Sequence, residues 1–578
     1  MSDNTTPTPA NPGAGAPRVL VFTATYNEKD NIERLCAEVL ALPLDVSLMV
    51  VDDNSPDGTG DLLNAMAARD PRITVIHRPR KLGLGTAHKL AMAYAAKRDI
   101  DILVTMDADF SHNPKDIPRL VQAVETADFA VGSRYMEGGS CDYEGYRLRV
   151  SQAANKAARI LLGIPLHEMT TSFRAFRVSM LRTVDFPRIQ SQGYSFFLEC
   201  VWQISRAGFR VTEIPIHFAD RVHGQSKIPR HEIWTGLRKL MTLFLRRLRG
   251  WRRWRVPSQP AEGHCLSCGS DLLVEMYPAR RRAEAQGAAA YRCTSMEHGS
   301  KPQVIRCLCC GLVAAGHAPS GAELIALYGD VADTVYLENR AGRERTFSSV
   351  LKEVESLAPR KGRLLEVGAY CGIFLQAAQT SGWTAEGVEP SRWAVGIARE
   401  SGLNIHAGTL QENRGALSPP YDVAVMWDVL EHLSDPIGEL KHVRELMADD
   451  ALLFVSTLDI DGWWPQLLGP RWPWIMDMHL FYPSIPGLRD LFGRAGFELV
   501  EVRPYRHHAS LRYLADKVSA LLPAPMGWLA GLAGRLMPRN RFLEIHLGDV
   551  KLFVCRKAPL PQSSAVSSTI ALAPVAAR

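Results

Sequence analysis

The sequence lacks two features that would place it in or across a membrane. No uninterrupted apolar run reaches the eighteen or so residues that a membrane-spanning helix needs. Residues 1–17 are rich in Pro, Ala and Thr and have neither the basic start nor the apolar stretch of a secretory signal. We therefore expect a cytoplasmic protein that touches a bilayer without crossing it, with disordered tails at 1–17 and 557–578.

Cysteine usage and net charge favour neither a disulfide framework nor a nucleic-acid partner. Eleven cysteines scattered over 578 residues fit reduced thiols or a metal site better than a disulfide framework. A net charge of +6 is too small to indicate a nucleic-acid partner by itself. The remaining composition is that of a globular protein, and the length predicts two or more domains.

Positive charge is concentrated in one segment. Residues 235–255 hold eight Lys or Arg and no acidic residue, with Leu, Met, Phe and Trp between them. If this segment is helical, it suits attachment to an anionic membrane surface. A helix that packs on the core with its Arg side chains reaching solvent is an equally weighted interpretation. RNA binding ranks lower, because no nucleic-acid-binding motif accompanies the segment.

Strand-like runs alternate with helical patterns from residue 18, and a second series of this kind begins near residue 362. Such alternation predicts parallel sheets covered by helices, here as two Rossmann-like α/β domains with a Cys-rich segment between them. The expected parts are an α/β domain at 18–232, a basic segment and linker at 233–263, the Cys-rich segment at 264–315 and a second α/β domain at 316–556.

Two carboxylates follow the predicted strand "DILVTM". Alternation sends the side chains of Asp107 and Asp109 to the same side, beyond the carboxyl end of the strand, where α/β sheets bind ligands. Paired oxygen ligands suit Mg²⁺ or Mn²⁺, although a helix cap and turn is the commoner use of such a pair. Asp52 and Asp53 end an earlier strand in "VVDDNSPDGTG", and Arg134, Arg221 and Lys227 are cations that can clamp a diphosphate.

Eight stretches of the first domain occur together, in order, in one known family. They are "ATYNEKDNI", "VVDDNSPDGTG", "KLGLGTA", "MDADFSHNP", "VGSRYMEGG", "TTSFRAFR", "GYSFFLEC" and "EIPIHFADRVHGQSKI". On these residues the domain resembles the family 2 glycosyltransferases of the dolichol-phosphate mannosyltransferase type. The resemblance implies a GT-A fold, a nucleotide sugar such as GDP-mannose as donor, a polyprenyl phosphate as acceptor, and Mg²⁺ or Mn²⁺.

The resemblance also implies roles for particular residues. Asp107 and Asp109 would hold the metal and diphosphate, and Arg134, Arg221 and Lys227 the phosphates. The residues expected to line the nucleotide-sugar site in addition are Ala24, Tyr26, Glu28, Val50, Asp52 and Ala108. Three positions depart from forms common in the family: Ala24 replaces Pro, Ser111 replaces a metal-binding Gln, and Glu168 replaces Asp. A polyprenyl phosphate is already an anionic nucleophile, so a single inverting displacement needs alignment and leaving-group stabilisation more than a base.

Two Cys-x-x-Cys pairs follow the linker. Cys265 and Cys268 form the first, and Cys307 and Cys310 the second. Four thiolates in this pattern favour a closed, structural Zn²⁺ site over buried free thiols, with Cys293 and Cys309 as competing ligands.

The second α/β series opens with "LLEVGAYCGIFLQAA", a strand followed by a Gly-bearing turn. With "AEGVEPS" and "YDVAVMWDVLEHLSDP" it resembles class I S-adenosylmethionine (SAM)-dependent methyltransferases that carry an N-terminal zinc-binding segment. The resemblance places Glu366, Gly368 and Gly372 along the methionine part of SAM, Glu389 at the ribose and Asp428 near the adenine. A dinucleotide-binding oxidoreductase is disfavoured, because the turn lacks the tighter Gly-x-Gly-x-x-Gly spacing.

The residues thus predict a bifunctional enzyme, peripherally attached to the inner face of the membrane, with no nucleic-acid partner. His432 and His479 are candidate general bases of the methyl transfer, although a lone His is more often a hydrogen-bonded core residue. The alternative is an active glycosyltransferase whose second half only binds SAM or acts as a scaffold. The methyl acceptor and the oligomeric state are not encoded in any motif.

Overall fold

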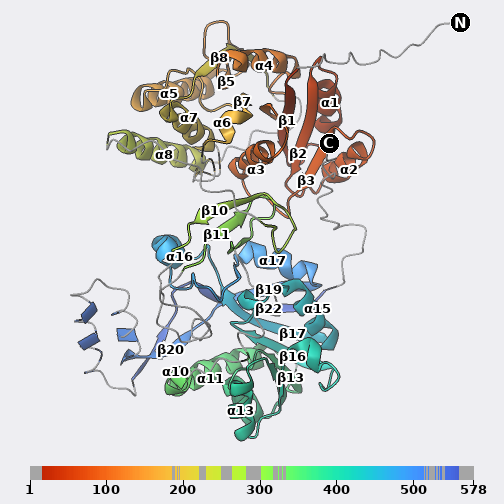
Figure 1. Ribbon diagram of the computed structural model, residues 1–578, viewed down its shortest axis with the longest axis vertical. Helices are drawn as coiled ribbons and strands as arrows, with labels where there is room; N and C mark the ends of the chain where they lie inside the picture. Colours follow the sequence, from red (N-terminus) through yellow and green to blue (C-terminus); the bar gives the residue numbers. More distant parts are fainter. Residues whose placement is uncertain are drawn as a thin grey trace, which may run out of the picture.

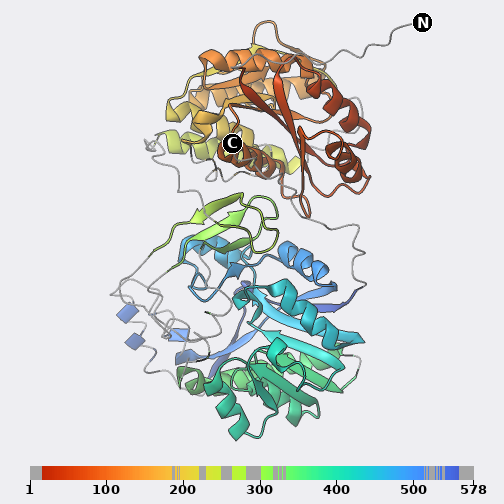
Figure 2. The same ribbon diagram turned by 45° about the vertical axis from the view of Figure 1, so that its right-hand side comes forward.

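The computed structural model describes residues 16–558, with gaps. Outside the description lie 185, 187–188, 190, 192, 194, 221–229, 249–262, 281–300, 317–322, 324–328, 330–333, 359, 513, 516–518, 520–526, 529–530, 533, 535 and 537–540. The two tails predicted to be disordered therefore fall almost wholly outside it. Two α/β bodies lie at the ends of the long axis, and a small sheet lies between them in both views (Figures 1 and 2).

The first body is built on a seven-stranded mixed sheet of order β3-β2-β1-β4-β7-β5-β8. Only β7 runs antiparallel to its neighbours. The strands of this body, including the short β6–β9 pair, are β1 (Arg18–Thr25), β2 (Asp45–Asp52), β3 (Ile73–His77), β4 (Ile102–Asp107), β5 (Phe129–Ser133), β6 (Ser140–Cys141), β7 (Arg174–Arg177), β8 (Val211–Pro215) and β9 (His217–Phe218).

Helices cover both faces of this sheet, which explains why its central strands are apolar throughout. Val19 and Val21 of β1 pack in one cluster with α1 and α4, whereas Leu20 and Phe22 face α3 and α7. The helices are α1 (Lys29–Leu40), α2 (Thr59–Ala67), α3 (Leu84–Lys97), η1 (Pro114–Asp116), α4 (Ile117–Thr126), α5 (Gly145–Leu162), α6 (Val178–Leu181), α7 (Ser195–Ala207) and α8 (Arg230–Leu248).

The basic segment forms helix α8 over its described part, and residues 249–255 lie outside the description. One face is docked on the first body: Leu240 and Leu243 are buried, and Lys239 Nζ lies 3.0 Å from the buried carboxylate of Glu199. The opposite face exposes an apolar stripe of five residues: Trp234, Leu237, Met241, Leu245 and Leu248. Among the described residues, no helix combines the length and apolarity that crossing a membrane requires.

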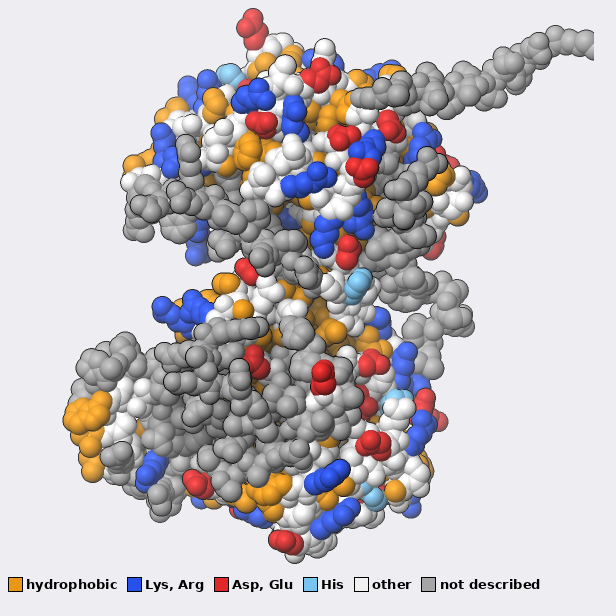
Figure 3. Space-filling view, in the orientation of Figure 1, with side chains coloured by type: hydrophobic (Ala, Val, Ile, Leu, Met, Phe, Trp, Pro, Cys, Tyr) orange, Lys and Arg blue, Asp and Glu red, His pale blue; other side chains and the backbone are white. Residues whose placement is uncertain are grey.

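The middle sheet has the order β10-β11-β12-β18 and is antiparallel. Its strands are β10 (Leu273–Tyr277), β11 (Val304–Cys307), β12 (Val313–Ala315) and β18 (Phe481–Tyr482). The fourth strand comes from the second α/β body, so the Cys-rich segment is joined to that body by strand pairing. In the space-filling view the molecule narrows at this level (Figure 3).

The second body contains a seven-stranded sheet of order β15-β14-β13-β16-β17-β22-β19, in which only β22 runs antiparallel. This order, with the antiparallel strand inserted next to the edge, is that of class I methyltransferases. The strands are β13 (Arg363–Val367), β14 (Thr384–Glu389), β15 (Ile405–Ala407), β16 (Tyr421–Trp427), β17 (Met447–Leu458), β19 (Phe497–Pro504) and β22 (Val550–Lys557), with a separate pair β20 (His507–Ser510) and β21 (Phe542–Ile545).

Alternating residues of this sheet again enter two apolar layers. Leu364 of β13 packs with α11 and α12, whereas Leu365 packs with α15 and α17. The helices are α10 (Thr334–Glu338), α11 (Arg340–Leu357), α12 (Ile373–Thr380), α13 (Arg392–Glu400), α14 (Leu410–Asn413), η4 (Leu430–His432), α15 (Pro436–Leu446), α16 (Trp463–Leu468), η5 (Gly469–Arg471) and α17 (Ile485–Arg494). The predicted fold class, two α/β domains with a Cys-rich segment between them, is confirmed.

Candidate functional site

The carboxyl end of β1 collects the predicted residues of the first domain. Thr25 lies opposite Asp52 of β2, and Ala24 lies opposite Asp107 of β4, so the two carboxylates flank β1 at the same edge of the sheet. Tyr26 continues from β1 at this edge, with the ammonium of Lys81 over its ring at 3.2 Å. The edge thus combines carboxylates with an aromatic ring.

Asp52 is held as a buried anion. Its carboxylate accepts from Thr25 Oγ1 at 3.0 Å, and from the amide and hydroxyl of Ser55 at 3.0 and 2.5 Å. Burial alone would raise the pKa of Asp52, but His77 and these hydrogen bonds outweigh burial and hold the pKa below its usual value. The charge is therefore present at neutral pH.

Serine hydroxyls orient the other two carboxylates. Ser172 Oγ donates to Asp107 Oδ1 at 2.7 Å, and Ser111 Oγ donates to Asp109 Oδ1 at 2.6 Å. Ser111, where the family pattern often has a metal-binding Gln, here acts on Asp109 instead. Hydrogen bonds of this kind fix the orientation of both carboxylates.

Sequence reasoning missed His112. The N–H of Asp107 donates to His112 Nδ1 at 3.2 Å, so Nδ1 is the unprotonated nitrogen and Nε2–H donates to Thr171 Oγ1 at 3.1 Å. Burial lowers the pKa of His112 to about 3, which keeps this neutral tautomer. The imidazole is stacked on Phe173 with a centroid distance of 5.0 Å. His112 therefore positions the loop that carries both aspartates. Its presence in the stretch "MDADFSHNP" was the sequence signal by which it could have been identified.

Backbone strain marks the same edge. Asn27, Asn54 and Phe110 have φ values of 61°, 58° and 61°, and each follows the end of β1, β2 or β4 by two or three residues. Non-glycine residues rarely adopt this left-handed region, and such residues cluster at functional sites.

Arg134 is already engaged in a buried ion pair. Its Nε lies 2.7 Å from Glu168 Oε2 and its Nη2 lies 3.4 Å from Oε1, while the Phe218 ring lies 4.2 Å from the guanidinium carbon. Burial opposes the charge, but Glu168 outweighs it and raises the pKa of Arg134. Two of the five N–H donors of Arg134 are thus occupied. The other two predicted cations, Arg221 and Lys227, lie outside the described residues.

The remaining predicted residues of this domain differ in placement. Glu28 begins α1, where its carbonyl accepts from the amides of Asn31 and Ile32, both at 3.0 Å. Ala108 is buried between the two aspartates. Val50 is fully buried inside β2, two residues before the strand ends, in the layer beneath α1 and α4. The structure does not bring the side chain of Val50 to the edge that holds Asp52 and Asp107.

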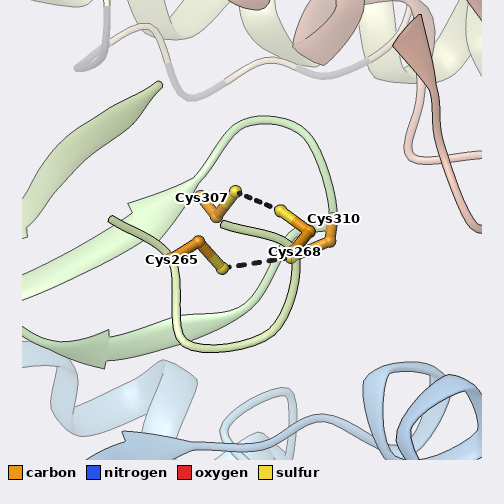
Figure 4. Close-up of side chains that lie close together, drawn as sticks. All are labelled: Cys265, Cys268, Cys307 and Cys310. Atoms are coloured by element: carbon orange, nitrogen blue, oxygen red, sulfur yellow. Dashed lines mark hydrogen bonds between the residues drawn. The ribbon is translucent and has the colours of Figure 1, made fainter. Parts of the chain in front are cut away.

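Four thiols converge between the two domains (Figure 4). Cys265 Sγ lies 3.5 Å from Cys310 Sγ, and Cys268 Sγ lies 3.6 Å from Cys307 Sγ. These distances are far from a disulfide bond and close to the separation of about 3.8 Å between thiolates around a tetrahedral ion. Hydrogen bonds from the other three thiols lower the pKa of Cys265, so the cluster favours a thiolate even by itself.

Cys309, the proposed competitor, does not belong to this cluster. Its sulfur lies 3.1 Å from Ser270 Oγ in the interior, and it is not one of the four closely spaced ligand atoms. Cys293, the other competitor, lies outside the described residues. The two Cys-x-x-Cys pairs therefore form a closed four-thiol site that is compatible with zinc.

In the second domain, two glycines shape a cradle after β13. Gly368 and Gly372 have φ values of +74° and +71°. A Cβ atom would lie 2.4 Å from Val429 Cγ2 at Gly368 and 2.3 Å from Leu403 Cδ1 at Gly372. Both the conformation and the space require glycine, as expected for a turn that lets its backbone approach a ligand closely.

Two buried carboxylates face this turn. Glu389 ends β14 and accepts from the amides of Tyr370 at 2.9 Å and Ser391 at 2.8 Å, yet burial raises its pKa to about 7. Burial and the charge of Glu389 raise the pKa of Glu366 well above its usual value. Glu366 Oε2 is buried and has no hydrogen-bond partner among the described residues. An orphaned carboxylate oxygen of this kind fits the ammonium group of a bound amino acid.

The third predicted strand end carries Asp428, whose φ is +54° and whose Oδ1 accepts from Ser456 Oγ at 2.7 Å. The next turn, η4, places Glu431 and His432 beside His479 from a distant segment. The structure thus brings the two predicted histidines together, with ring centroids 4.8 Å apart.

Two family models match the chain. The one described as glycosyl transferase family 2 matches residues 20–185, and the one described as a methyltransferase domain matches residues 338–502. The protein is therefore a two-domain transferase, with sugar-transferring and methyl-transferring domains in one polypeptide.

Relatives identify the type of the first domain. Polyprenol monophosphomannose synthase of Mycolicibacterium smegmatis is 41% identical over 214 residues, which cover 36% of this chain and 81% of the relative. Undecaprenyl-phosphate mannosyltransferase of Micrococcus luteus is 40% identical over 212 residues, which cover 36% of this chain and 87% of the relative. The chain belongs to the family 2 glycosyltransferases of the polyprenyl-phosphate mannosyltransferase type, as the sequence predicts.

Solved structures match the second domain at low scores. Magnesium protoporphyrin IX methyltransferase from Synechocystis aligns at 15% identity with a TM-score of 0.26, over 41% of this chain and 94% of that protein. A SAM-dependent methyltransferase from Archaeoglobus fulgidus aligns at 14% identity with a TM-score of 0.28, over 39% of this chain and 100% of that protein. At these scores neither structure carries an argument about the substrates of this chain.

Proposed function

We propose that the first domain transfers mannose from GDP-mannose to a polyprenyl phosphate, and that the second transfers a methyl group from SAM to an acceptor not yet identified. The observation that carries the first assignment is the edge where Asp52, Asp107 and Asp109 meet. It lies in a domain about 40% identical to enzymes named as polyprenyl-phosphate mannosyltransferases. The boundaries at 18–232, 233–263, 264–315 and 316–556 remain part of the proposal.

Several residues of the chain have separate roles in the proposed sugar transfer. Asp107 and Asp109 would hold Mg²⁺ or Mn²⁺, which when bound neutralises charge on the departing diphosphate. Asp52 and Tyr26 bind and orient the nucleoside, and Arg134, Arg221 and Lys227 bind the phosphates. An oxygen of the polyprenyl phosphate bonds to the sugar C1 as the bond to GDP breaks, and this single displacement inverts the anomeric centre.

Replacing Asp109 by Asn should lower sugar transfer by about 100-fold or more, because the amide cannot supply the negative charge that holds the cation. The measurement is incorporation of labelled mannose from GDP-mannose into organic-extractable lipid, with Mg²⁺ or Mn²⁺ present. Asp61→Asn, the same change at an exposed carboxylate of α2, serves as the matched control and should keep full turnover. Full turnover by Asp109→Asn would contradict the assignment.

A lipid acceptor would account for the side chains on the exposed face of α8. Glu199 and the buried leucines fix one face of this helix, so its apolar stripe of five residues points outward, beside the exposed cation Arg238. Arg247 instead donates to the carbonyl oxygens of Ile160 and Leu161 on α5. Apolar and basic side chains on one exposed face are what an anionic membrane interface binds. We infer peripheral attachment to the cytoplasmic face of the membrane through α8.

Introducing charge into the stripe tests this attachment. Leu237→Glu combined with Met241→Glu should weaken binding to vesicles containing anionic lipid by about tenfold or more, since it removes apolar burial and adds repulsion. Co-sedimentation measures the binding. Leu467→Glu, at an exposed leucine of α16 in the second domain, is the control and should bind as the unmodified protein does. Equal binding of all three proteins would exclude α8 as the contact.

The four-thiol site is proposed to hold one structural Zn²⁺ per chain, because four cysteines leave no coordination position for a substrate. Cys268→Ser should lose this zinc, measured as metal released on thiol modification of the purified protein. Cys309→Ser removes a neighbouring thiol that faces Ser270 and should retain the full amount. Zinc loss in Cys309→Ser but not in Cys268→Ser would contradict the ligand assignment.

The second domain is proposed to bind SAM in the cradle after β13. Glu366 would accept from the ammonium group of the methionine part, Gly368 and Gly372 give the backbone its close approach, and Glu389 would accept from the ribose hydroxyls. SAM supplies an electrophilic methyl group, and Asp428 lies on the adenine side. The unpartnered oxygen of Glu366 is the observation that supports this fit.

Glu389 gives this site a pH dependence. Its pKa is about 7 in the unliganded protein, and only the carboxylate accepts both hydroxyls. Affinity for S-adenosylhomocysteine (SAH) should therefore rise with pH below 7, by up to about tenfold per pH unit, and level off above it. Titration calorimetry between pH 6 and 8 measures this.

Glu389→Gln should bind SAH more weakly and with a smaller pH dependence, whereas Glu400→Gln, at an exposed site of α13, should match the wild type. A wild-type affinity that does not change with pH would contradict the role of Glu389. Absence of SAH binding would favour the alternative of a scaffolding domain, and Gly368→Arg provides the reference for a blocked cradle.

A further inference from the structure

The second domain contains a group of metal-ligating side chains unrelated to the four-thiol site. Glu431, His432 and His479 each offer one ligand atom, and these atoms lie within 4.8 Å of one another. A metal ion at about 2.1 Å from each would bring them to about 3 Å, which small side-chain movements achieve. Two imidazoles and one carboxylate form a ligand set typical of divalent transition metals in sites with open positions.

The histidines are oriented as metal ligands are. His432 Nδ1 lies 2.9 Å from the carbonyl oxygen of Met478, and His479 Nδ1 lies 2.7 Å from that of Trp474. A carbonyl only accepts, so Nδ1 carries the proton in both rings and each neutral ring has its lone pair on Nε2.

Glu431 supplies the third ligand atom of this group. Its side chain is 1% exposed, its Oε2 accepts from Thr457 Oγ1 at 2.8 Å, and no ion pair joins it to a described Lys or Arg. A buried carboxylate without a paired cation is costly, and a divalent ion would supply the positive charge.

The group lies against the SAM cradle. Val429, two residues before Glu431, is the side chain that a Cβ atom at Gly368 would strike. The amide of Leu480 donates to the carbonyl of Glu431 at 2.9 Å, which ties the His479 segment to η4. The turn that carries Glu431 and His432 therefore begins directly after the residue that packs against the proposed SAM cradle.

We propose that Glu431, His432 and His479 bind a divalent transition-metal ion that holds a hydroxyl oxygen of the methyl acceptor, such as a sugar hydroxyl. This inference rests on the proposed methyltransferase function. Three protein ligands leave positions open for that oxygen, and the ion lowers the pKa of the bound hydroxyl. After the proton passes to water, the oxygen bonds to the methyl carbon as the carbon–sulfur bond breaks, and SAH keeps the electron pair.

Mn²⁺ alone is the probe, because the free ion is counted directly by electron paramagnetic resonance. The zinc-loaded full chain is expected to bind two Mn²⁺, one at Asp107 and Asp109 and one here. His479→Gln and Asp109→Asn should each bind one. His442→Gln, a histidine of α15 that faces Glu439 at 3.8 Å, is the matched control and should bind two.

Glu431→Gln, which is nearly isosteric, should also bind one Mn²⁺. This second variant separates loss of the metal site from a folding defect in His479→Gln. Circular dichroism checks the fold of both variants. An unchanged Mn²⁺ count in both variants overturns the proposal, even if methyl transfer is lost. SAH binding is titrated separately in the same proteins. Its absence from the wild type contradicts the methyltransferase function, whereas an unaltered Mn²⁺ count with normal SAH binding contradicts the metal site only.

Discussion

The convergence of four thiols is the constraint on which the arrangement of the two domains depends. The two Cys-x-x-Cys turns close the β10–β11–β12 sheet, whose fourth strand, β18, belongs to the methyltransferase body. One continuous buried apolar cluster runs from Leu20 in the first domain through Leu272 and Ile305 of the Cys-rich segment to Phe553 in the second. With so small a sheet, a metal ion bound by the four thiols would add much of this segment's stability.

In both domains the candidate site lies just beyond the ends of buried parallel strands. A parallel sheet buried on both faces fixes the strand ends, and the residues just beyond them are forced into conformations that the rest of the fold must support. In the described part of the chain, the non-glycine residues with positive φ all follow central strands: Asn27, Asn54, Phe110, Tyr370 and Asp428. The rigid sheets hold acidic groups in place at these ends, so little reorganisation is needed when a ligand binds.

The sequence was sufficient for the fold and for the convergence of the four thiols, because turns, strand ends and Cys spacing are short-range signals. The roles of Asp107, Asp109 and the glycines of the cradle stay predictions. Contacts between distant segments were not identifiable. The pairing of Arg134 with Glu168, the support of Asp107 by His112, and the approach of His479 to Glu431 depend on tertiary packing. Val50 is buried inside β2, and its place in the nucleotide-sugar site stays a prediction from the family resemblance.

The segment after β3 shows how closely the two halves are linked. Arg78 pairs with Asp53 just beyond the end of β2, and Lys81 covers Tyr26, while Arg80 between them pairs with Asp490 of α17 in the methyltransferase body. Arg80 and Asp490 are both partly exposed, so their ion pair contributes about 1 kcal/mol at most. Cohesion between the halves therefore comes mainly from apolar packing through the Cys-rich sheet. Polar contacts from the end of α3 add to it, since Lys97 Nζ donates to the carbonyl of Asp271 and Arg98 lies 3.7 Å from the Asp271 carboxylate.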